Sequence, residues 1–262
     1  MKHYAYEAPF EMVDKKGNKY TLRVEQDDMA ESPREWDNMS TMICWHRHYN
    51  LGDKHNYDDS FEFLLGVARE VGIYTDAMED MTDEEIMTEL RKDDSVCIVP
   101  LNLYDHSGIT MSTSNGYPYN DRWDAGCVGY AYITKEKAMK ELREYEVDEN
   151  GKRIKIEHKH DNGNVTYSHK TKPLTDETWR ARAREVIDAE VETYDQYLRG
   201  DVYGYILEKE ITVEEKCPHC GEVINTYTET EEVDSCWGFY GDEIESNGIF
   251  DTIAIVDIEF VD

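Results

Sequence analysis

The chain has 262 residues, 39% of them hydrophobic, and its 58 acidic side chains against 28 Lys and Arg give a formal net charge of −30. A surface this negative repels nucleic acid and anionic lipid, which excludes direct binding to either and favours basic protein partners. The chain has no apolar run long enough for a membrane span and no apolar leader, and six cysteines suit a reducing compartment, so we expect a soluble cytoplasmic protein.

The first third of the chain predicts two strands and two helices. The strands are indicated by apolar–polar alternation and β-branched content, and the helices by apolar residues at helical spacing behind capping-box pairs. The predicted strands are Asn18–Asp27 and Met39–His48, and the predicted helices are Asp59–Gly72 and Thr82–Lys92.

Two histidines, His46 and His48, stand one residue apart at the end of the second predicted strand. On a strand both imidazoles point to one face, an arrangement that metals use, and Asp37 and Asp53 could complete a mixed site. The alternative is a pair of half-buried, hydrogen-bonding histidines beside Trp45.

The middle of the chain predicts a buried strand, a long loop, a second strand and a helix. Ser95–Tyr104 is the most apolar strand, but Pro100 removes a ladder donor and favours an edge position or a bulge. A long polar loop over 106–126 follows. The next predicted elements are a strand over Cys127–Thr134 and a helix over Thr134–Tyr145.

Residues 147–175 are the one region in which basic side chains outnumber acidic ones. Asn162-Gly163 is a strong two-residue turn signal and predicts a β-hairpin in this region. In that register His158 pairs with Tyr167, histidines and apolar residues share one face, and lysines gather on the other as a basic patch.

The remaining residues, 176–262, combine one long helix with several strands and the largest acidic excess. An apolar stripe predicts a helix over Asp176–Leu198, and Gly200 supplies its stop. From Gly200 onward only Lys209 and Lys216 are basic. The predicted strands are Val202–Ile211, Val223–Thr230, Asp234–Tyr240 and Thr252–Phe260.

This order of helices and strands is mixed rather than a regular βαβ alternation. It predicts the α+β class, with a mixed, largely antiparallel sheet, several amphipathic helices and an inserted β-hairpin. We expect an N-terminal α+β region over 1–146, a basic hairpin insertion over 147–175 and an acidic helix-plus-strands region over 176–262. The first and third regions could form one continuous domain.

The segment Cys217-Pro-His-Cys220-Gly221 is the sharpest local motif. It resembles one knuckle of a zinc ribbon, in which Pro and Gly shape a turn that aims two thiolates at one metal. A closed structural zinc site needs four ligands. Cys236 could supply the third, and Cys127 or a hairpin histidine the fourth. The alternative is a reduced cysteine pair in a hairpin turn, with no cofactor.

Six motif-like stretches are spread across most of the chain. They are Ser32–Asn38 (SPREWDN), Trp45–Asp53 (WHRHYNLGD), Leu103–Ser112 (LYDHSGITMS), Trp123–Ile133 (WDAGCVGYAYI), Glu192–Tyr203 (ETYDQYLRGDVY) and Ser235–Gly241 (SCWGFYG). Together they resemble a family of uncharacterised proteins of bacteriophages and integrated mobile elements. The resemblance implies an accessory gene product in a bacterial cytoplasm. It carries over no catalytic residues.

Charge and this implied origin together predict an interaction protein rather than an enzyme. Restriction and CRISPR effectors hold nucleic acid in positively charged channels, which a carboxylate-rich protein can occupy as a nucleic-acid mimic. We therefore expect an inhibitor whose partner is a basic host defence protein. The expected contact residues surround the predicted C-terminal hairpin and its exit, and they are Glu229, Glu231, Glu232, Asp234, Asp242, Glu243 and Glu245.

The alternative is a pocket protein that binds or hydrolyses a nucleotide-like defence signal, with or without a metal. Aromatic side chains mixed with His and Asp suit such a pocket. The candidate pocket residues are Trp36, Trp45, His46, His48, Asp105, His106, Trp123 and Asp124.

Overall fold

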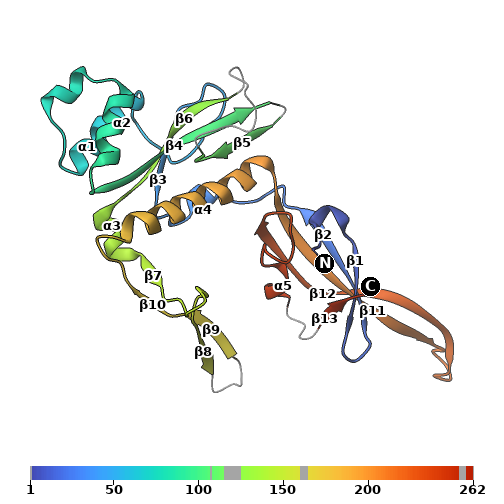
Figure 1. Ribbon diagram of the computed structural model, residues 1–262. Coiled ribbons are helices and arrows are strands. Elements are labelled where there is room, and N and C mark those ends of the chain that lie inside the picture. Colours follow the sequence, from blue (N-terminus) through green and yellow to red (C-terminus); the bar gives the residue numbers. More distant parts are fainter. Residues whose placement is uncertain (1, 107, 115–124, 160–164, 254–257, 262) are drawn as a thin grey trace. The chain divides into compact units, whose positions relative to one another are not determined.

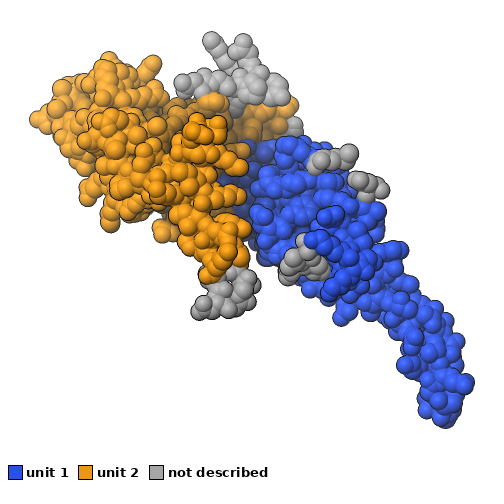
Figure 2. Space-filling view, turned by 60° about the horizontal axis from the view of Figure 1, so that its bottom comes forward, with its two compact units in different colours: residues 1–33, 193–262 blue, residues 34–192 orange. Residues whose placement is uncertain are grey.

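In the computed structural model (Figure 1), the chain forms two compact units, which Figure 2 shows in different colours. Unit 1 contains residues 1–33 and 193–262, and unit 2 contains residues 34–192. The boundaries expected after residues 146 and 175 both fall within unit 2. The structure describes residues 2–106, 108–114, 125–159, 165–253 and 258–261.

Both units mix helices with antiparallel sheet, so the predicted α+β class is confirmed. Every strand pair in the described part of the chain is antiparallel. No helix among the described residues is long and apolar enough to cross a bilayer.

Unit 1 is built on a five-stranded sheet in the order β12-β11-β2-β1-β13. Its core forms where the apolar side chains of the central strands meet those of the C-terminal segment, and it includes Leu22, Tyr205, Leu207 and Ile249. The elements are η1 (Ala5–Glu7), β1 (Phe10–Asp14), β2 (Lys19–Gln26), β11 (Val202–Lys216), β12 (Val223–Tyr240), α5 (Ile249–Thr252) and β13 (Ile258–Phe260).

The hairpin β11–β12 is much longer than the sheet that carries it. Strand β2 pairs with β11 only from Tyr203 to Lys209. Beyond that point β11 and β12 pair with each other alone among the described residues, as far as Lys216 opposite Val223. We call residues 210–231 the arm; it is the narrow extension of unit 1 in Figure 2. The arm is about 25 Å long, at about 3.3 Å per residue.

The sequence-based prediction divided this hairpin into three shorter strands, and that was wrong. Strand β12 runs without interruption through the acidic segment at 229–234. A bulge accommodates the irregularity there, because Leu207 lies opposite Asp234 and Glu208 opposite Glu232. Charged residues disfavour buried strands, but a strand exposed to water needs no apolar face.

Unit 2 is built on a four-stranded sheet in the order β3-β6-β4-β5. Its core on one face joins helices α1 and α2 to Val96 and Ile98 of the central strand. Burial raises the pKa of the neighbouring Cys97 thiol, and Arg180 and Arg184 of helix α4 oppose this effect. The sheet elements are β3 (Thr41–Cys44), β4 (Val96–Asp105), β5 (Ile109–Ser112) and β6 (Ala125–Thr134), and the helices are α1 (Ser60–Glu70), α2 (Asp83–Lys92), α3 (Lys135–Glu141) and α4 (Trp179–Arg199).

The predicted starts of helices α1 and α2 and the predicted edge position at Pro100 are confirmed. The Asp59 carboxylate accepts the Glu62 N–H at 2.9 Å, and Thr82 forms a reciprocal capping box with Glu85. At Pro100 strand β4 is an edge strand, because β5 pairs only from Asn102 onward. The missing proline donor is therefore tolerated there.

The loop expected over 106–126 was partly wrong, because it contains β5 and the start of β6. The helix expected over Thr134–Tyr145 is shorter, since it ends at Glu141 and the chain continues as β7 (Arg143–Tyr145). Strand β7 pairs with β10 (Thr171–Pro173).

The basic hairpin forms from β8 (Lys155–Lys159) and β9 (Val165–His169), but its predicted register was wrong by one residue. Glu157, not His158, lies opposite Tyr167. A slip of one residue changes which side chains share a face, so the predicted separation of histidines from lysines does not form. The His158 ring contacts the Ser168 hydroxyl at 2.7 Å, and the predicted turn at 162–163 lies outside the described residues.

Candidate functional site

The arm carries its carboxylates on both faces of a two-stranded ribbon. Directly paired residues share a face and neighbours alternate. One face combines Ile211 and Val213 of β11 with Tyr227 and Glu229 of β12. The other is lined by threonines together with acids, and its members are Glu210, Thr212, Glu214, Thr226, Thr228 and Thr230.

Within the described part of the chain, four of the six arm carboxylates form no ion pair, although Lys209 lies opposite Glu231 in the ladder. Glu214 lies 3.5 Å from Lys216, and Glu210 lies 3.9 Å from Lys19, both at exposed positions. Among the described residues, Glu215, Glu229 and Glu231 form no ion pair and are exposed. The sequence-based set missed Glu215 and Glu222, because the predicted strand ended at Ile211; the alternating Thr212-Val213 was the signal for a longer strand.

The structure divides the predicted contact residues into groups with different surroundings. Glu229 and Glu231 lie on the arm, on the face of Ile211. Glu232 lies opposite Glu208, at the base of the arm, and like charges in that position destabilise a sheet. Arg23 offsets this repulsion, since its guanidinium lies 3.5 Å from Glu208.

Asp234 is part of the sheet rather than of the arm. Its carboxylate accepts the Tyr205 hydroxyl at 2.8 Å. Burial, followed by this hydrogen bond, raises the pKa of Tyr205. Asp234 therefore satisfies a buried polar group of the core and is poorly placed for a partner.

The N-terminal segment contacts the three remaining acids of the predicted set, Asp242, Glu243 and Glu245. The Glu243 carboxylate lies 2.8 Å from the Lys2 ammonium, and Glu245 lies 2.6 Å from the His3 ring. Asp242 contributes its carbonyl, which accepts the Ala5 N–H at 2.7 Å. Although burial opposes it, hydrogen bonding from His3 lowers the pKa of Glu245. The carboxylates of Glu243 and Glu245 and the backbone carbonyl of Asp242 therefore serve the fold of unit 1, so the arm is the stronger candidate surface.

The Cys-Pro-His-Cys-Gly motif forms the tip of the arm. The Cys217 N–H donates to the Glu222 carbonyl at 2.8 Å, and the Gly221 N–H donates to the Cys217 carbonyl at 2.9 Å. Gly221 has φ +79°, a conformation that side chains rarely adopt. The backbone N–H groups of His219 and then Cys220 hydrogen-bond the Cys217 sulfur and lower the pKa of its thiol.

The predicted third ligand, Cys236, was wrong. It lies in β12 opposite Tyr205, about 40 Å along the strand from the tip. Cys127 and the hairpin histidines belong to unit 2. Among the residues that the structure describes, no three His, Cys, Asp or Glu side chains converge on a metal position. The tip therefore offers two thiols of a four-ligand set.

A pocket of about 410 Å³ lies in unit 2 where the chain leaves β3. Its side-chain lining comes from Trp45, His46, Arg47, Leu103 and Asp105, and the start of β6 supplies the rest. The hydrogen bond from the Trp45 N–H to the Val128 carbonyl, at 2.7 Å, keeps this segment beside β6.

His46 is oriented by its neighbours. Its Nδ1 accepts the backbone N–H groups of His48 and Tyr49, each at 3.3 Å, and its ring stacks on Tyr49. A neutral His46 therefore carries its proton on Nε2, which lies 3.9 Å from the Asp105 carboxylate. The arrangement presents a ring N–H and a carboxylate to a bound molecule.

Only part of the predicted pocket set comes together. Trp45, His46 and Asp105 line the pocket, whereas His48 lies beside it, its ring centre 6.0 Å from that of His46. The His106 ring contacts Tyr104 instead. Arg47 and Leu103 were missed, although Leu103 shares a strand face with Asp105. Trp123 and Asp124 lie outside the described residues.

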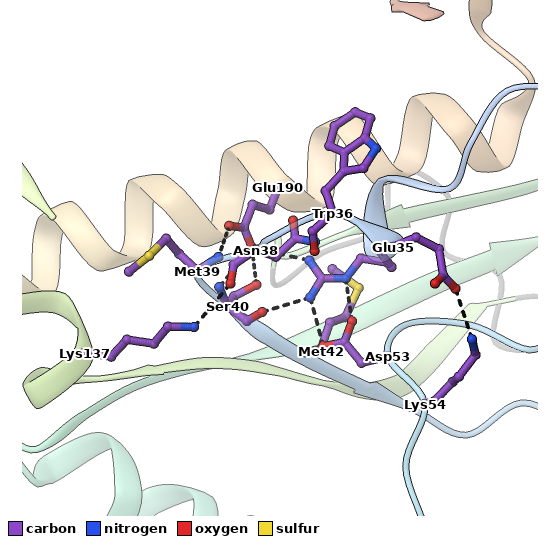
Figure 3. Close-up of polar contacts among 11 residues, drawn as sticks. Glu35, Trp36, Asn38, Met39, Ser40, Met42, Asp53, Lys54, Lys137 and Glu190 are labelled. Carbon is purple, nitrogen blue, oxygen red and sulfur yellow. Dashed lines mark hydrogen bonds and ion pairs between the residues drawn. The ribbon is translucent and has the colours of Figure 1, made fainter. Parts of the chain in front are cut away.

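Trp36 lies near a different cluster, in which Asp53, Glu190 and Ser40, all labelled in Figure 3, contact the buried Arg34. The Arg34 side chain is 3% exposed, binds both Asp53 oxygens at 2.8 and 2.9 Å, and lies 3.3 Å from Glu190. In Figure 3 the Trp36 indole points away from these contacts, and it is 45% exposed.

The Arg34 cluster also accounts for Asp53, one of the acids expected at the metal site of His46 and His48. Asp53, proposed there as a metal ligand, binds Arg34 and the Met42 N–H instead. The strand ends at Cys44, so the two histidines do not share a strand face as expected. The cluster is structural, because its buried charges are matched by hydrogen bonds within unit 2.

The chain matches no protein-family model, no curated protein and no solved structure. What the protein binds must therefore follow from the chemistry of the arm, its tip and the Trp45 pocket.

Proposed function

We propose that this chain is an acidic interaction protein of a phage or mobile element. In this proposal it inhibits a host defence nucleic-acid enzyme, of CRISPR-Cas or restriction type, by occupying the nucleic-acid-binding surface. The observation that carries the proposal is the arm, a projecting ribbon whose exposed carboxylates largely lack ion pairs. The phage origin rests on the resemblance of the six sequence stretches alone.

The shape and charge of the arm support this role. Residues 210–231 carry Glu210, Glu214, Glu215, Glu222, Glu229 and Glu231 against the single cation Lys216. Over its length this is about one net charge per 5 Å, compared with about one per 1.7 Å of duplex DNA. The arm is thus a weaker polyanion than DNA, and we expect a salt dependence that is real but less steep.

The test is a charge-neutralising variant with a matched control. Glu215→Gln, Glu229→Gln and Glu231→Gln together remove three exposed arm charges without removing an ion pair. Glu84→Gln, Glu177→Gln and Glu192→Gln remove three exposed charges from unit 2. We expect the arm variant to weaken binding to the host enzyme at least tenfold, and the control less than twofold.

The measurement begins with capture from a bacterial lysate at low and high salt. The captured enzyme is then tested for displacement of its own nucleic acid by the wild-type chain. If the arm variant displaces nucleic acid as well as the wild type, the arm is not the contact. If no nucleic-acid enzyme is inhibited at any ionic strength, the proposed function is wrong.

The Trp45 pocket favours a second candidate, a protein that binds or hydrolyses a nucleotide-like defence signal. Trp45 offers a surface for a base, and His46 with Asp105 offers a hydrogen-bonding pair. Calorimetry with a panel of nucleotides separates the two ideas. A ligand whose binding is lost in Asp105→Asn and unchanged in the arm variant would favour the pocket.

A further inference from the structure

The tip of the arm has the geometry of half a tetrahedral thiolate site. Cys217 and Cys220 flank a Pro-His turn that Gly221 closes with a positive φ. The Cys217 N–H donates to the Glu222 carbonyl and the Gly221 N–H donates to the Cys217 carbonyl, so both cysteines lie on one tight turn. A turn of this kind presents two sulfur ligands to a single Zn²⁺.

The other two ligands of such a zinc site do not come from the same hairpin. Structural Zn²⁺ takes four ligands, usually Cys or His, and Cys236 is about 40 Å away along β12. Glu222 contacts Cys220 at 3.8 Å, but it does not complete a group of three ligands in the described part of the chain. Two further ligands must therefore come from outside this hairpin.

We propose that the Cys217–Cys220 pairs of two copies of this chain close one Zn²⁺ site and join two arms tip to tip. A two-fold axis through the metal supplies two identical knuckles and four thiolates, which satisfies zinc with no further residue. The tip is accessible for this contact, because Cys220 is exposed and Val223 and Ile224 beside it are 47% and 60% exposed. A second copy would cover these apolar side chains.

The negative charge near the tip determines how the stability of this dimer depends on salt. Each arm carries Glu214, Glu215 and Glu222 close to the tip, so two tips repel each other at low ionic strength. Added salt screens the repulsion, and the zinc–thiolate bonds themselves depend little on it. The dimer should therefore strengthen with salt, whereas binding to a basic host protein should weaken.

The experiment uses the full chain, reduced and freed of metal by a chelator, and titrated with Zn²⁺ or Co²⁺. Light scattering after size exclusion gives the mass, and elemental analysis gives the metal content. We expect a dimer with one metal per two chains and, with Co²⁺, the thiolate charge-transfer and visible bands of a tetrahedral four-sulfur site. Cys217→Ser with Cys220→Ser should stay monomeric and bind no metal, with an unchanged circular dichroism spectrum.

The matched control is Cys127→Ser with Cys236→Ser, which should dimerise as the wild type does. A monomer with one tightly bound metal per chain would overturn the shared site. So would a chain that binds no metal, or one isolated with a Cys217–Cys220 disulfide under reducing conditions. The serine variant at the tip leaves every arm carboxylate in place, so failure of this site is distinguishable from failure of the host-protein contact.

Discussion

At the scale of single residues, unit 2 is stabilised both by helix caps between residues three apart and by the ion pairs of Arg34 with Asp53 and Glu190. The caps at Asp59 and Thr82 involve partners three residues away, so the sequence displays them directly. Arg34 binds Glu190, and no short-range pattern connects two residues that far apart in the chain. The same limit explains why Asp53 was assigned to a metal site instead of to Arg34.

Asp14 gives a prediction for pH dependence at this scale. Hydrogen bonding from the Asn18 side chain, outweighing the effect of burial, together with the N–H groups of Asn18 and Lys16, lowers the pKa of Asp14 to about 2. Its ordinary value is about 3.8. Because the folded-state pKa is depressed, Asp14 stabilises the fold fully above pH 3.8, and this contribution disappears as the pH falls towards 2.

The measurement is an NMR titration of the Asp14 carboxyl in the wild type and in Asn18→Ala. We expect a wild-type midpoint of about 2 and a higher midpoint in the variant. A midpoint at or above 3.8 would show that the turn does not hold the ionised form.

At the scale of elements, helices and buried strands were predicted well, and hairpin pairing was predicted poorly. Periodicity identified α1, α2 and α4, because each carries one apolar stripe, and an apolar run identified β4, whose residues 96–99 are all buried. Strand β12 was broken in two, because most of it is exposed and has no burial pattern to follow. For the same reason, the contact set predicted from the sequence contained only Glu229 and Glu231 of the arm's acids.

Gly204 of β11 tests how the base of the hairpin is packed. A Cβ at this position would lie 2.1 Å from the Trp237 ring, so the indole lies directly on the glycine backbone. We expect Gly204→Ala to lower the free energy of unfolding by about 1–3 kcal/mol, the usual effect of overpacking. Chemical denaturation measures this change.

Two further variants make the Gly204 prediction specific. In a Trp237→Ala background, Gly204→Ala should cost little, since the clashing ring is gone. Gly108→Ala should be nearly neutral, because no atom of the described residues, its chain neighbours aside, lies within 4 Å of a Cβ built there. An equal loss from Gly204→Ala in both backgrounds would contradict the contact with Trp237.

At the scale of the whole molecule, charge decides how the chain responds to salt. A net charge of −30 produces repulsion within the folded state, which competes with the buried cores of the two units. Few cations are placed to relieve it beyond Gly200, where Lys209 and Lys216 are the only basic residues. The response to salt could be predicted from composition alone, because net charge does not depend on which residues contact each other.

We expect the melting temperature to rise by at least a few degrees between about 0.02 M and 0.2 M sodium chloride, as the Debye length shortens. Scanning calorimetry measures it. Tetramethylammonium chloride should give the same rise if screening is the cause. A melting temperature that falls with both salts would mean that attractive ion pairs outweigh the self-repulsion.

In the arm, the outer edges of β11 and β12 pair with no other strand of the described residues, and this affects how the protein avoids aggregation. Residues such as Ile224, Thr226 and Tyr227 have high β-propensity, and an uncovered strand of this kind can recruit the same strand of a neighbouring molecule into a growing fibril. The ionised glutamates act as gatekeepers against that stacking. Replacing these glutamates with uncharged residues would therefore turn the arm into a site of amyloid-like assembly.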